Sequence, residues 1–154
     1  MTSKPCLLIL DIDGVLITSP PWKPDELHLD GYSQFNRDCV ENLNDLLKTN
    51  VFEMYLSSTR RTVKTINEFN RIFRNRGIIQ NLKGFVPEYP KAKNRREEIE
   101  YFLKEFNPKN YLILDDDKSL NDSKVEMKNR LVLTELQIGF TKEKLTEALN
   151  LIGL

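Results

Sequence analysis

A run of apolar residues that ends in two alternating carboxylates constrains the fold of this chain more than any other feature of its sequence. Residues 6–10 are all apolar, and Asp11, Asp13 and Gly14 follow directly. An uninterrupted run of this kind is typical of a strand covered on both faces, as in the middle of the sheet of an α/β protein. Ligands bind at the carboxyl ends of such strands, which is where these two carboxylates lie. The alternative is an Asp-Gly turn that merely ends a strand.

Strand and helix patterns alternate along the rest of the chain. Short apolar segments predict further strands at 51–56, near Phe85, at 111–114 and at 131–133. Apolar residues at helical spacing predict helices over 35–49, from Val63 to near Gly77, over 94–106 and around 145–152. The alternation indicates one α/β domain over residues 1–154, with three layers and a mainly parallel five-stranded sheet.

Three of the predicted strands end in groups that can carry chemistry. In a parallel sheet the carboxyl ends of the strands share one edge, so we expect these groups to converge there. One carboxylate can act as a nucleophile, a second can transfer protons, and together they attract a divalent cation. The three groups are Asp11 with Asp13, Ser57-Ser58-Thr59, and Asp115-Asp116-Asp117.

The formal net charge of zero conceals an uneven distribution of charge. Residues 60–96 contain eleven Lys and Arg against two Glu, whereas residues 1–59 and 97–126 each carry nine acidic and four basic side chains. A basic segment beside an acidic metal site suits a phosphate-bearing substrate, and a nucleic acid is one such substrate. The alternative is that these charges lie on solvated helix faces.

The remaining composition argues against several other classes of protein. Cys6 and Cys39 lie in apolar contexts without metal-ligand spacing, which predicts buried thiols rather than a disulfide framework. The only histidine, His28, lies in a Pro-rich loop, so catalysis built on histidine is not expected. No apolar stretch approaches the roughly 18 residues of a membrane span. We therefore expect a cytoplasmic protein without a membrane partner; its oligomeric state is not predicted.

Four segments of the chain resemble the motifs of the haloacid dehalogenase (HAD) superfamily, in its phosphatase branch. They occur in the required order over roughly residues 5–133. The resemblance implies a three-layer, Rossmann-like HAD fold. The segments are Asp11-Ile12-Asp13-Gly14-Val15-Leu16 for the first motif, Leu56-Ser57 for the second, Lys93 for the third and Ile113-Leu114-Asp115-Asp116 for the fourth.

The resemblance also implies an enzyme, a phosphatase that needs Mg²⁺ and forms an aspartyl-phosphate on Asp11. Asp13 would protonate the leaving oxygen and later help to activate water, which requires a protonatable carboxylate. Mg²⁺ would be held by Asp11, by the backbone carbonyl of Asp13 and by Asp116, with Asp115 as a further candidate ligand.

The same resemblance assigns phosphate contacts to residues outside the carboxylate group. Ser57 would donate a hydrogen bond to a phosphoryl oxygen, and Lys93 would neutralise charge beside Asp11. Lys91, Arg95 and Arg96 lie close enough in the sequence to take the role of Lys93 instead. Candidates for further substrate contacts are Gly14, Ser58, Arg60 and Trp22.

Three segments are similar to a variant HAD group that occurs in bacterial Swiss Army Knife RNA-repair proteins. The similarity includes basic residues near a Glu-Ile pair at a helix start, an Arg after a Ser/Thr-rich strand end, and a late Gly-hydrophobic-Thr. In this chain these features are Arg95-Arg96-Glu97-Glu98-Ile99, Ser57-Ser58-Thr59-Arg60 and Gly139-Phe140-Thr141.

The intervals between the motifs are too short to hold a cap domain. Ser57 follows Asp11 by 46 positions and Lys93 follows Ser57 by 36, and each interval already contains a helix and a strand. The loop over residues 18–32 remains, with Trp22 as a candidate wall or lid. We therefore expect an open site, which suits a nucleic-acid end or a phosphoprotein; a small phosphorylated metabolite is the alternative substrate.

Two hypotheses from other functional classes were weighed against the phosphatase. Response-regulator receivers also gather acidic residues, Ser/Thr and Lys around Mg²⁺, but they carry the phosphorylated Asp after the third strand. Here the third strand offers no Asp, and the second Asp cluster follows the fourth strand. A catalytically silent interaction domain is disfavoured because Asp11 and Asp13 are both present.

Overall fold

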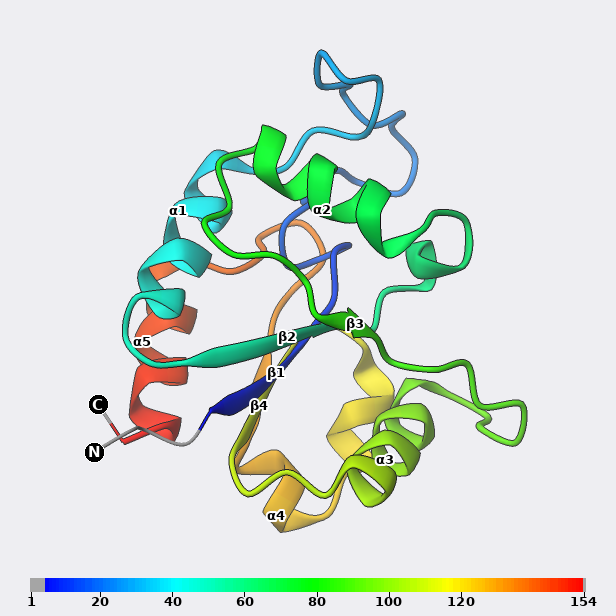
Figure 1. Cartoon of the computed structure of the whole chain (residues 1–154), viewed down its shortest axis with the longest axis vertical. Coiled ribbons are helices and arrows are strands. Elements are labelled where there is room, and N and C mark those ends of the chain that lie inside the picture. The colour runs from blue at the N-terminus through cyan, green and yellow to red at the C-terminus, as the bar shows by residue number, and fades with distance from the viewer. Residues whose placement is uncertain (1–4, 154) are drawn as a thin grey trace.

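A five-stranded sheet, parallel throughout, forms the centre of the molecule (Figure 1). The structure is a computed structural model, and it describes residues 5–153. The strand order is β3-β2-β1-β4-β5, with the Asp-bearing first strand in the middle. The α/β class and the parallel five-stranded sheet are thus confirmed. The strands are β1 (Cys6–Leu10), β2 (Phe52–Leu56), β3 (Gly84–Phe85), β4 (Tyr111–Asp115) and β5 (Leu131–Leu133).

Helices cover both faces of the sheet and give the three expected layers (Figure 1). α1 (Arg37–Leu47), α2 (Ile66–Asn75) and α5 (Lys142–Leu151) pack on one face. α3 (Arg95–Phe106) and the short α4 (Val125–Lys128) pack on the other. Two 3₁₀ turns, η1 (Thr59–Thr62) and η2 (Lys118–Asp122), follow β2 and β4. Within residues 5–153, none of the helices is long and apolar enough to cross a membrane.

The central strand divides its side chains between the two layers. Leu8 and Leu10 pack into the core beneath α1, α2 and α5, whereas Leu7 and Ile9 pack into the core beneath α3 and α4. Alternation of this kind follows from the two-residue period of a strand. All five residues of β1 are buried, as its uninterrupted apolar sequence predicts.

The start of α2 differs from the predicted helix. Thr65 and Glu68 form a capping box, in which each side chain accepts a hydrogen bond from the backbone N–H of the other. This cap fixes the helix start at Ile66. Val63 lies before the cap and is 73% exposed, so its predicted inward position is wrong. The predicted burial of Cys6 and Cys39 as free thiols is confirmed.

Backbone hydrogen bonds between neighbouring strands continue to the polar residues at the strand ends. The Asp11 N–H donates to the Leu114 carbonyl at 3.0 Å, and the Ser57 N–H donates to the Leu10 carbonyl at 2.9 Å. Asp115 is the last residue of β4, and its carbonyl accepts from the Thr134 N–H at 2.9 Å. The sheet therefore fixes the backbone of the first functional residue at each of these strand ends.

The segment between β1 and α1 holds no cap domain. Residues 18–36 contain no helix or strand, apart from an isolated bridge between Leu27 and Ser33. Asn36 ties the end of this loop to its beginning, because its N–H donates to the Leu16 carbonyl at 2.6 Å and its side chain donates to Thr18 at 3.1 Å. We refer to residues 18–36 as the β1–α1 loop.

Candidate active site

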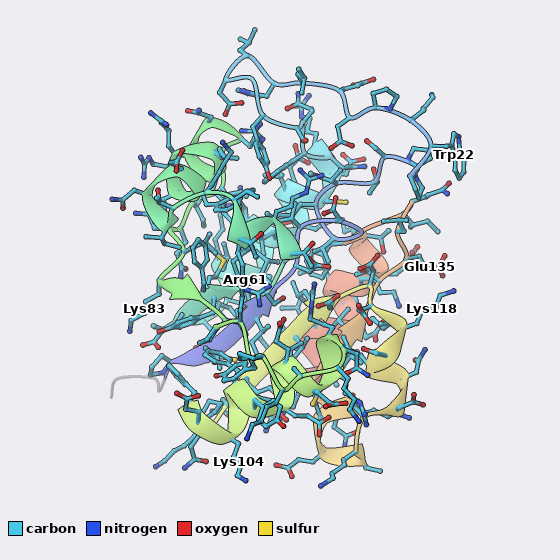
Figure 2. The ribbon with its side chains drawn as sticks, turned by 90° about the vertical axis from the view of Figure 1, so that its right-hand side faces the viewer. Trp22, Arg61, Lys83, Lys104, Lys118 and Glu135 are labelled. Carbon is cyan, nitrogen blue, oxygen red and sulfur yellow. The ribbon has the colours of Figure 1, made fainter. Side chains whose placement is uncertain are left out.

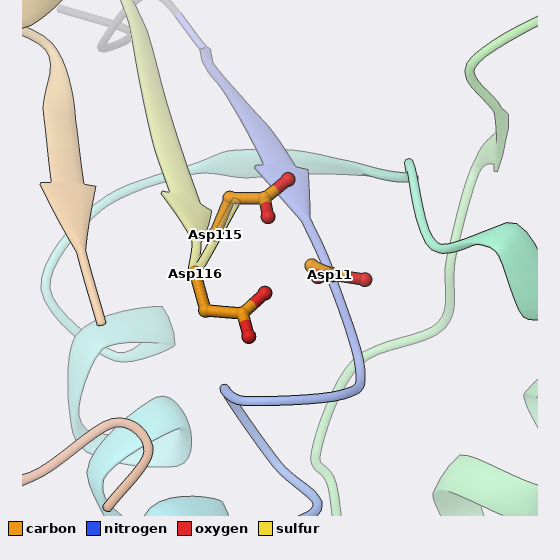
Figure 3. A group of neighbouring side chains, drawn as sticks. All are labelled: Asp11, Asp115 and Asp116. Carbon is orange, nitrogen blue, oxygen red and sulfur yellow. The ribbon is translucent and has the colours of Figure 1, made fainter. Parts of the chain in front are cut away.

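Three aspartates from two neighbouring strands meet at the carboxyl edge of the sheet (Figure 3). Asp11 directly follows β1, and Asp115 and Asp116 lie at the end of β4. One carboxylate oxygen from each lies within 4.8 Å of the others. Asp11 and Asp115 are buried and Asp116 is partly exposed, so the group opens to solvent on the Asp116 side. The predicted convergence of these two strand ends is seen.

A tight turn at Gly14 brings the backbone after β1 against Asp116. Gly14 has a φ of +78°, and a Cβ at this position would overlap the Asp116 side chain. Only glycine meets both demands without strain. Thr134, just after β5, donates its hydroxyl to the Gly14 carbonyl at 2.6 Å and fixes the turn from the other side. Gly14 is buried, so the structure gives it a role in shaping the site rather than an exposed contact surface.

Arg95 is the cation that lies beside the buried aspartates. Its Nη1 is 2.8 Å from Asp115 Oδ2 and 3.6 Å from Asp11 Oδ2. Arg95 is the first residue of α3 because Asn94 caps the helix by accepting from the Glu97 N–H at 2.9 Å. Lys93 precedes this cap and is exposed, and within residues 5–153 no ion pair joins it to Asp11, Asp115 or Asp116. Arg95 is therefore the cation that lies beside Asp11.

The other two candidates for that position point elsewhere. Arg96 pairs with Glu97 and Glu100 on its own helix, and its backbone N–H donates to Ser119. Lys91 is exposed. Arg95 alone among the four candidates has an ion pair with Asp11, within the part of the chain that the structure describes.

Burial and mutual repulsion dominate the electrostatics of the three aspartates. Burial raises the pKa of Asp11 to about 6, partly offset by the nearby Arg95 guanidinium. Burial also raises the pKa of Asp115 well above its ordinary value, and the charge of Asp11 adds to this effect. The pKa of Asp116 is raised by burial and by Asp115. Three crowded carboxylates with one arginine leave an excess of negative charge.

A divalent cation fits this donor set. Carboxylate oxygens are the hard ligands that Mg²⁺ prefers, and Mg²⁺ is commonly held by only one or two carboxylates together with waters and phosphate. Asp11, Asp115 and Asp116 offer such oxygens close together at an open edge. The cation would also offset their repulsion. Three of the four residues expected to hold Mg²⁺, namely Asp11, Asp115 and Asp116, are therefore compatible with it by chemistry and by spacing.

Ser57 and Ser58 differ in how their hydroxyls are used. Both residues are fully buried at the end of β2. Ser58 Oγ accepts from the Arg60 N–H at 3.2 Å and caps η1, so it has a local structural role in place of the predicted substrate contact. Ser57 Oγ has no hydrogen-bond partner among the described residues. A buried hydroxyl without a partner is uncommon, and it leaves Ser57 Oγ free to donate to a ligand.

Arg61 and Glu98 form an ion pair next to the site. Arg61 was not predicted from the sequence, and Glu98 was noted there only as part of the motif at the helix start. The Arg61 guanidinium is buried and donates to the carbonyls of Ser57 at 2.8 Å and Val86 at 2.7 Å, which joins the ends of β2 and β3 (Figure 2). Glu98 lies 3.0 Å from Arg61 and 3.7 Å from Arg95 Nε. The spacing of Glu98 three residues after Arg95 was the one local signal for this pair.

Arg60 binds the second aspartate of the first motif. Its Nε and Nη2 donate to the two carboxylate oxygens of Asp13 at 2.8 and 2.9 Å. The guanidinium also contacts Asp25, Tyr32 and Ser33 of the β1–α1 loop. Arg60 was predicted to contact substrate, and in the structure its guanidinium is occupied by protein groups.

Trp22 extends from the β1–α1 loop into solvent. Its side chain is 75% exposed and lies at the outer margin of the molecule (Figure 2). Within residues 5–153, no hydrogen bond or cation–π contact joins Trp22 to the residues of the site. The structure thus does not bring the predicted wall residue to the carboxylates.

Many of the Lys and Arg side chains of residues 60–96 form ion pairs with acidic side chains of the protein. Arg60, Arg61, Arg76 and Arg95 are largely buried and paired with acidic side chains. Lys83 pairs with Glu53 at 2.9 Å. The hypothesis of a continuous basic surface is therefore reduced to fewer exposed cations: Arg71, Arg74, Lys91 and Lys93 are exposed, and Lys64 is partly exposed.

The sequence comparison is consistent with this geometry. The profile of the family described as the HAD domain in Swiss Army Knife RNA repair proteins matches residues 7–145. The match spans β1 to α5 and includes every residue of the candidate site. A search of curated proteins finds no significant match. The chain therefore belongs to the family of HAD domains found in Swiss Army Knife RNA repair proteins.

Proposed function

We propose that this chain is a Mg²⁺-dependent phosphohydrolase that removes a phosphate from a nucleic-acid end. One observation carries the proposal. The Asp11 carboxylate lies at the end of the central strand, beside the Arg95 guanidinium and within a group of carboxylates that suits Mg²⁺. A second, partly exposed aspartate, Asp13, follows two residues later. This arrangement supplies a nucleophile, a proton donor and charge compensation in one place.

The reaction proceeds in two displacements. A carboxylate oxygen of Asp11 attacks the phosphorus while the bond from phosphorus to the leaving oxygen breaks, and Asp13 donates a proton to that oxygen. Water then attacks the phosphorus of the aspartyl-phosphate while Asp13 accepts a proton. The bond between phosphorus and the Asp11 oxygen breaks, which releases inorganic phosphate and restores the carboxylate.

Charge compensation decides whether the first step is possible, because a carboxylate repels a phosphate dianion. Bound at Asp11, Asp115 and Asp116, with the expected carbonyl of Asp13, Mg²⁺ would shield this repulsion and orient the phosphate. Arg95, held by Asp115 and near Glu98, keeps a fixed positive charge beside Asp11. The Ser57 hydroxyl, which has no partner among the described residues, would donate to a phosphoryl oxygen.

Two features support a nucleic-acid end over a small metabolite. The site has no cap domain to enclose a small substrate, and the β1–α1 loop does not replace one. A cavity of about 780 Å³ adjoins Asp116 and is bordered by Lys118, Leu133 and Glu135, so a substrate can extend beyond the carboxylates. The family name, which refers to RNA repair proteins, points to the same class of substrate.

A phosphatase screen tests the proposal directly. Oligonucleotides with a 3′- or 5′-phosphate would be compared with nucleotides, sugar phosphates and phosphopeptides in the presence of Mg²⁺. We expect phosphate release from an oligonucleotide, loss of all activity in excess chelator, and no recovery with Ca²⁺. Ca²⁺ favours higher coordination numbers and can engage both oxygens of a carboxylate, which would occupy the nucleophile. Full activity in excess chelator would contradict the metal-dependent mechanism.

The salt dependence of the affinity for a phosphorylated oligonucleotide separates the two substrate classes. Each phosphate neutralised on a single strand contributes about −0.7 to the slope of log affinity against log salt. We expect a slope of about −2 or steeper if several exposed cations contact the strand. Arg71→Glu and Arg74→Glu should raise the oligonucleotide KM and leave p-nitrophenyl phosphate unaffected. A flat salt response with efficient turnover of a sugar phosphate would replace the nucleic-acid end with a metabolite.

A further inference from the structure

Arg60 connects the second aspartate of the site to a carboxylate far away in the sequence. Its Nη2 lies 2.9 Å from Asp13 Oδ1 and 2.9 Å from Asp25 Oδ2, so one nitrogen serves both acids. Its Nε donates separately to Asp13 Oδ2 at 2.8 Å. The planar guanidinium of Arg60 therefore holds both oxygens of Asp13, and Asp25 is its second acidic partner.

The remaining contacts of the guanidinium come from the same loop as Asp25. Nη1 is 3.2 Å from the Tyr32 hydroxyl and 3.2 Å from Ser33 Oγ. Ser33 Oγ donates to Asp25 Oδ2 at 2.6 Å, which closes a small network around Arg60. The hydrogen bond from Ser33 lowers the pKa of Asp25, and Arg60 adds to this effect, so Asp25 is ionised near neutral pH. All partners of the guanidinium other than Asp13 thus belong to the β1–α1 loop.

We propose that Asp25 is a positioning residue that acts through Arg60 on Asp13, so that the β1–α1 loop orients the proton donor of the site. The arginine side chain is long and flexible, and the loop contacts restrict it to the orientation in which its guanidinium meets Asp13. Asp25 and Asp13 bind the same nitrogen of Arg60, so Asp25 can act on Asp13 through the guanidinium. This inference rests on the proposed phosphohydrolase function.

The loop also contains a matched control residue. Asp30 forms a similar pair with Arg76, at 2.7 Å from Nη1 and 3.1 Å from Nη2. No hydrogen bond or ion pair joins Asp30 to Arg60 or Asp13 within residues 5–153. Asp30 accepts from the Tyr32 N–H at 3.0 Å, but its carboxylate does not contact the Arg60 guanidinium. Asp25→Asn and Asp30→Asn therefore make the same chemical change in the same loop, and only the first removes a carboxylate that binds Arg60 directly.

The test compares kcat/KM for two small substrates that differ in their need for a proton. Phenyl phosphate has a basic leaving oxygen, whereas p-nitrophenyl phosphate releases a stable anion without assistance. We expect Asp25→Asn to lower kcat/KM for phenyl phosphate about tenfold, as a fraction of what general acid catalysis contributes. The value for p-nitrophenyl phosphate should change little, and Asp30→Asn should change neither value. Ser33→Ala provides a second variant that weakens the same network.

The outcomes separate this inference from the proposed function. Suppose that the wild-type protein is active. If Asp25→Asn then lowers kcat/KM equally for both substrates, or leaves both values unchanged, Asp25 does not position the proton donor. If wild-type protein hydrolyses no phosphate ester, the proposed function fails, and the Arg60 Nε–H signal in an NMR spectrum then decides the positioning. Its exchange with water should be faster in Asp25→Asn than in wild type and unchanged in Asp30→Asn. Unchanged exchange in Asp25→Asn would overturn the inference.

Discussion

Two arginines, each of which lies between two aspartates, divide the candidate site into halves that are built in different ways. In the buried half, Arg95 lies between Asp11 and Asp115 and its side chain is 9% exposed. In the loop half, Arg60 lies between Asp13 and Asp25 and its side chain is 23% exposed. The carboxylates of the buried half are attached to neighbouring strands of one sheet. Asp25 of the loop half belongs to a long segment without helix or strand.

This difference separates two tasks that a phosphohydrolase needs. The position of Asp11 and Asp115 is fixed by the hydrogen bonds between β1 and β4, so the proposed nucleophile and the proposed metal ligand cannot move independently. Their charges also interact strongly because water is largely excluded. The orientation of Asp13 depends on side-chain contacts with a loop, which is easier to perturb. We therefore expect changes in the buried half to remove activity and changes in the loop half to tune it.

The largest effect is expected from Asp11→Asn in the buried half. An amide cannot serve as the attacking group, so phosphate release should fall to background with every substrate. The replacement is nearly isosteric and removes one of three repelling charges, so the temperature of thermal unfolding should not fall. Metal-dependent activity near the wild-type level in this variant would rule out Asp11 as the nucleophile.

Asp13→Asn should have a smaller effect, which depends on the leaving group. General acid and base assistance contributes about 10²–10⁴-fold to such reactions, and overall turnover should fall by that amount. Phosphoenzyme should still form from p-nitrophenyl phosphate, because its leaving group needs little protonation. A stopped-flow burst of p-nitrophenolate followed by slow steady-state release is the expected signature. Unchanged steady-state turnover would show that the loop half takes no part in proton transfer.

Arg95→Gln tests whether Arg95, rather than Lys93, supplies the positive charge beside Asp11. Loss of a fixed charge aimed at a developing negative charge costs about 10²–10³-fold in kcat. Lys93→Gln is the matched control, and its turnover of p-nitrophenyl phosphate should stay close to wild type. Equal losses in the two variants, or a larger loss for Lys93→Gln, would return the role to the lysine.

The buried half was largely predictable from the sequence, and the reason is topological. Parallel strands end at one edge, so apolar runs that finish in Asp11 and Asp115 had to bring those residues together. The offset from Lys93 to Arg95 has a local cause. Asn94 caps α3, and the residue after the cap, rather than the one before it, lies beside the carboxylates. The helix start itself was predicted to within one residue, at Asn94, so the offset concerns only which neighbour of the cap lies beside the carboxylates.

Asp13 and Arg60 of the loop half were named from the sequence, but the contacts of Arg60 with Asp13 and Asp25 could not be predicted, because nothing in the local sequence marks them. Asp25 and Arg60 are 35 positions apart and lie in segments without periodicity. The same holds for Arg76, which added to the apparent basic excess of residues 60–96 but whose side chain is buried against Asp30. Counting charges along the chain cannot distinguish an arginine on the surface from one that is paired in the interior.

The smallest effect is expected at Asp30, which anchors the β1–α1 loop without touching the site. The Arg76 side chain is 2% exposed and that of Asp30 is 18% exposed, and their hydrogen bonds should stabilise the fold by about 1–2 kcal/mol. Arg76 holds the pKa of Asp30 below its ordinary value, so this contribution is present at neutral pH and is lost as the pH falls below 3.8.

Urea unfolding of wild type and Asp30→Asn at several pH values measures this contribution. The free energy of unfolding should be lower in the variant near neutral pH, and the two proteins should converge under acidic conditions. A difference that stays constant with pH would mean that the carboxylate charge contributes nothing to the anchor. Asp25→Asn should show a smaller loss of stability, since both members of its pair are more exposed. One acidic residue of the loop would then secure the fold, and the other would orient the site.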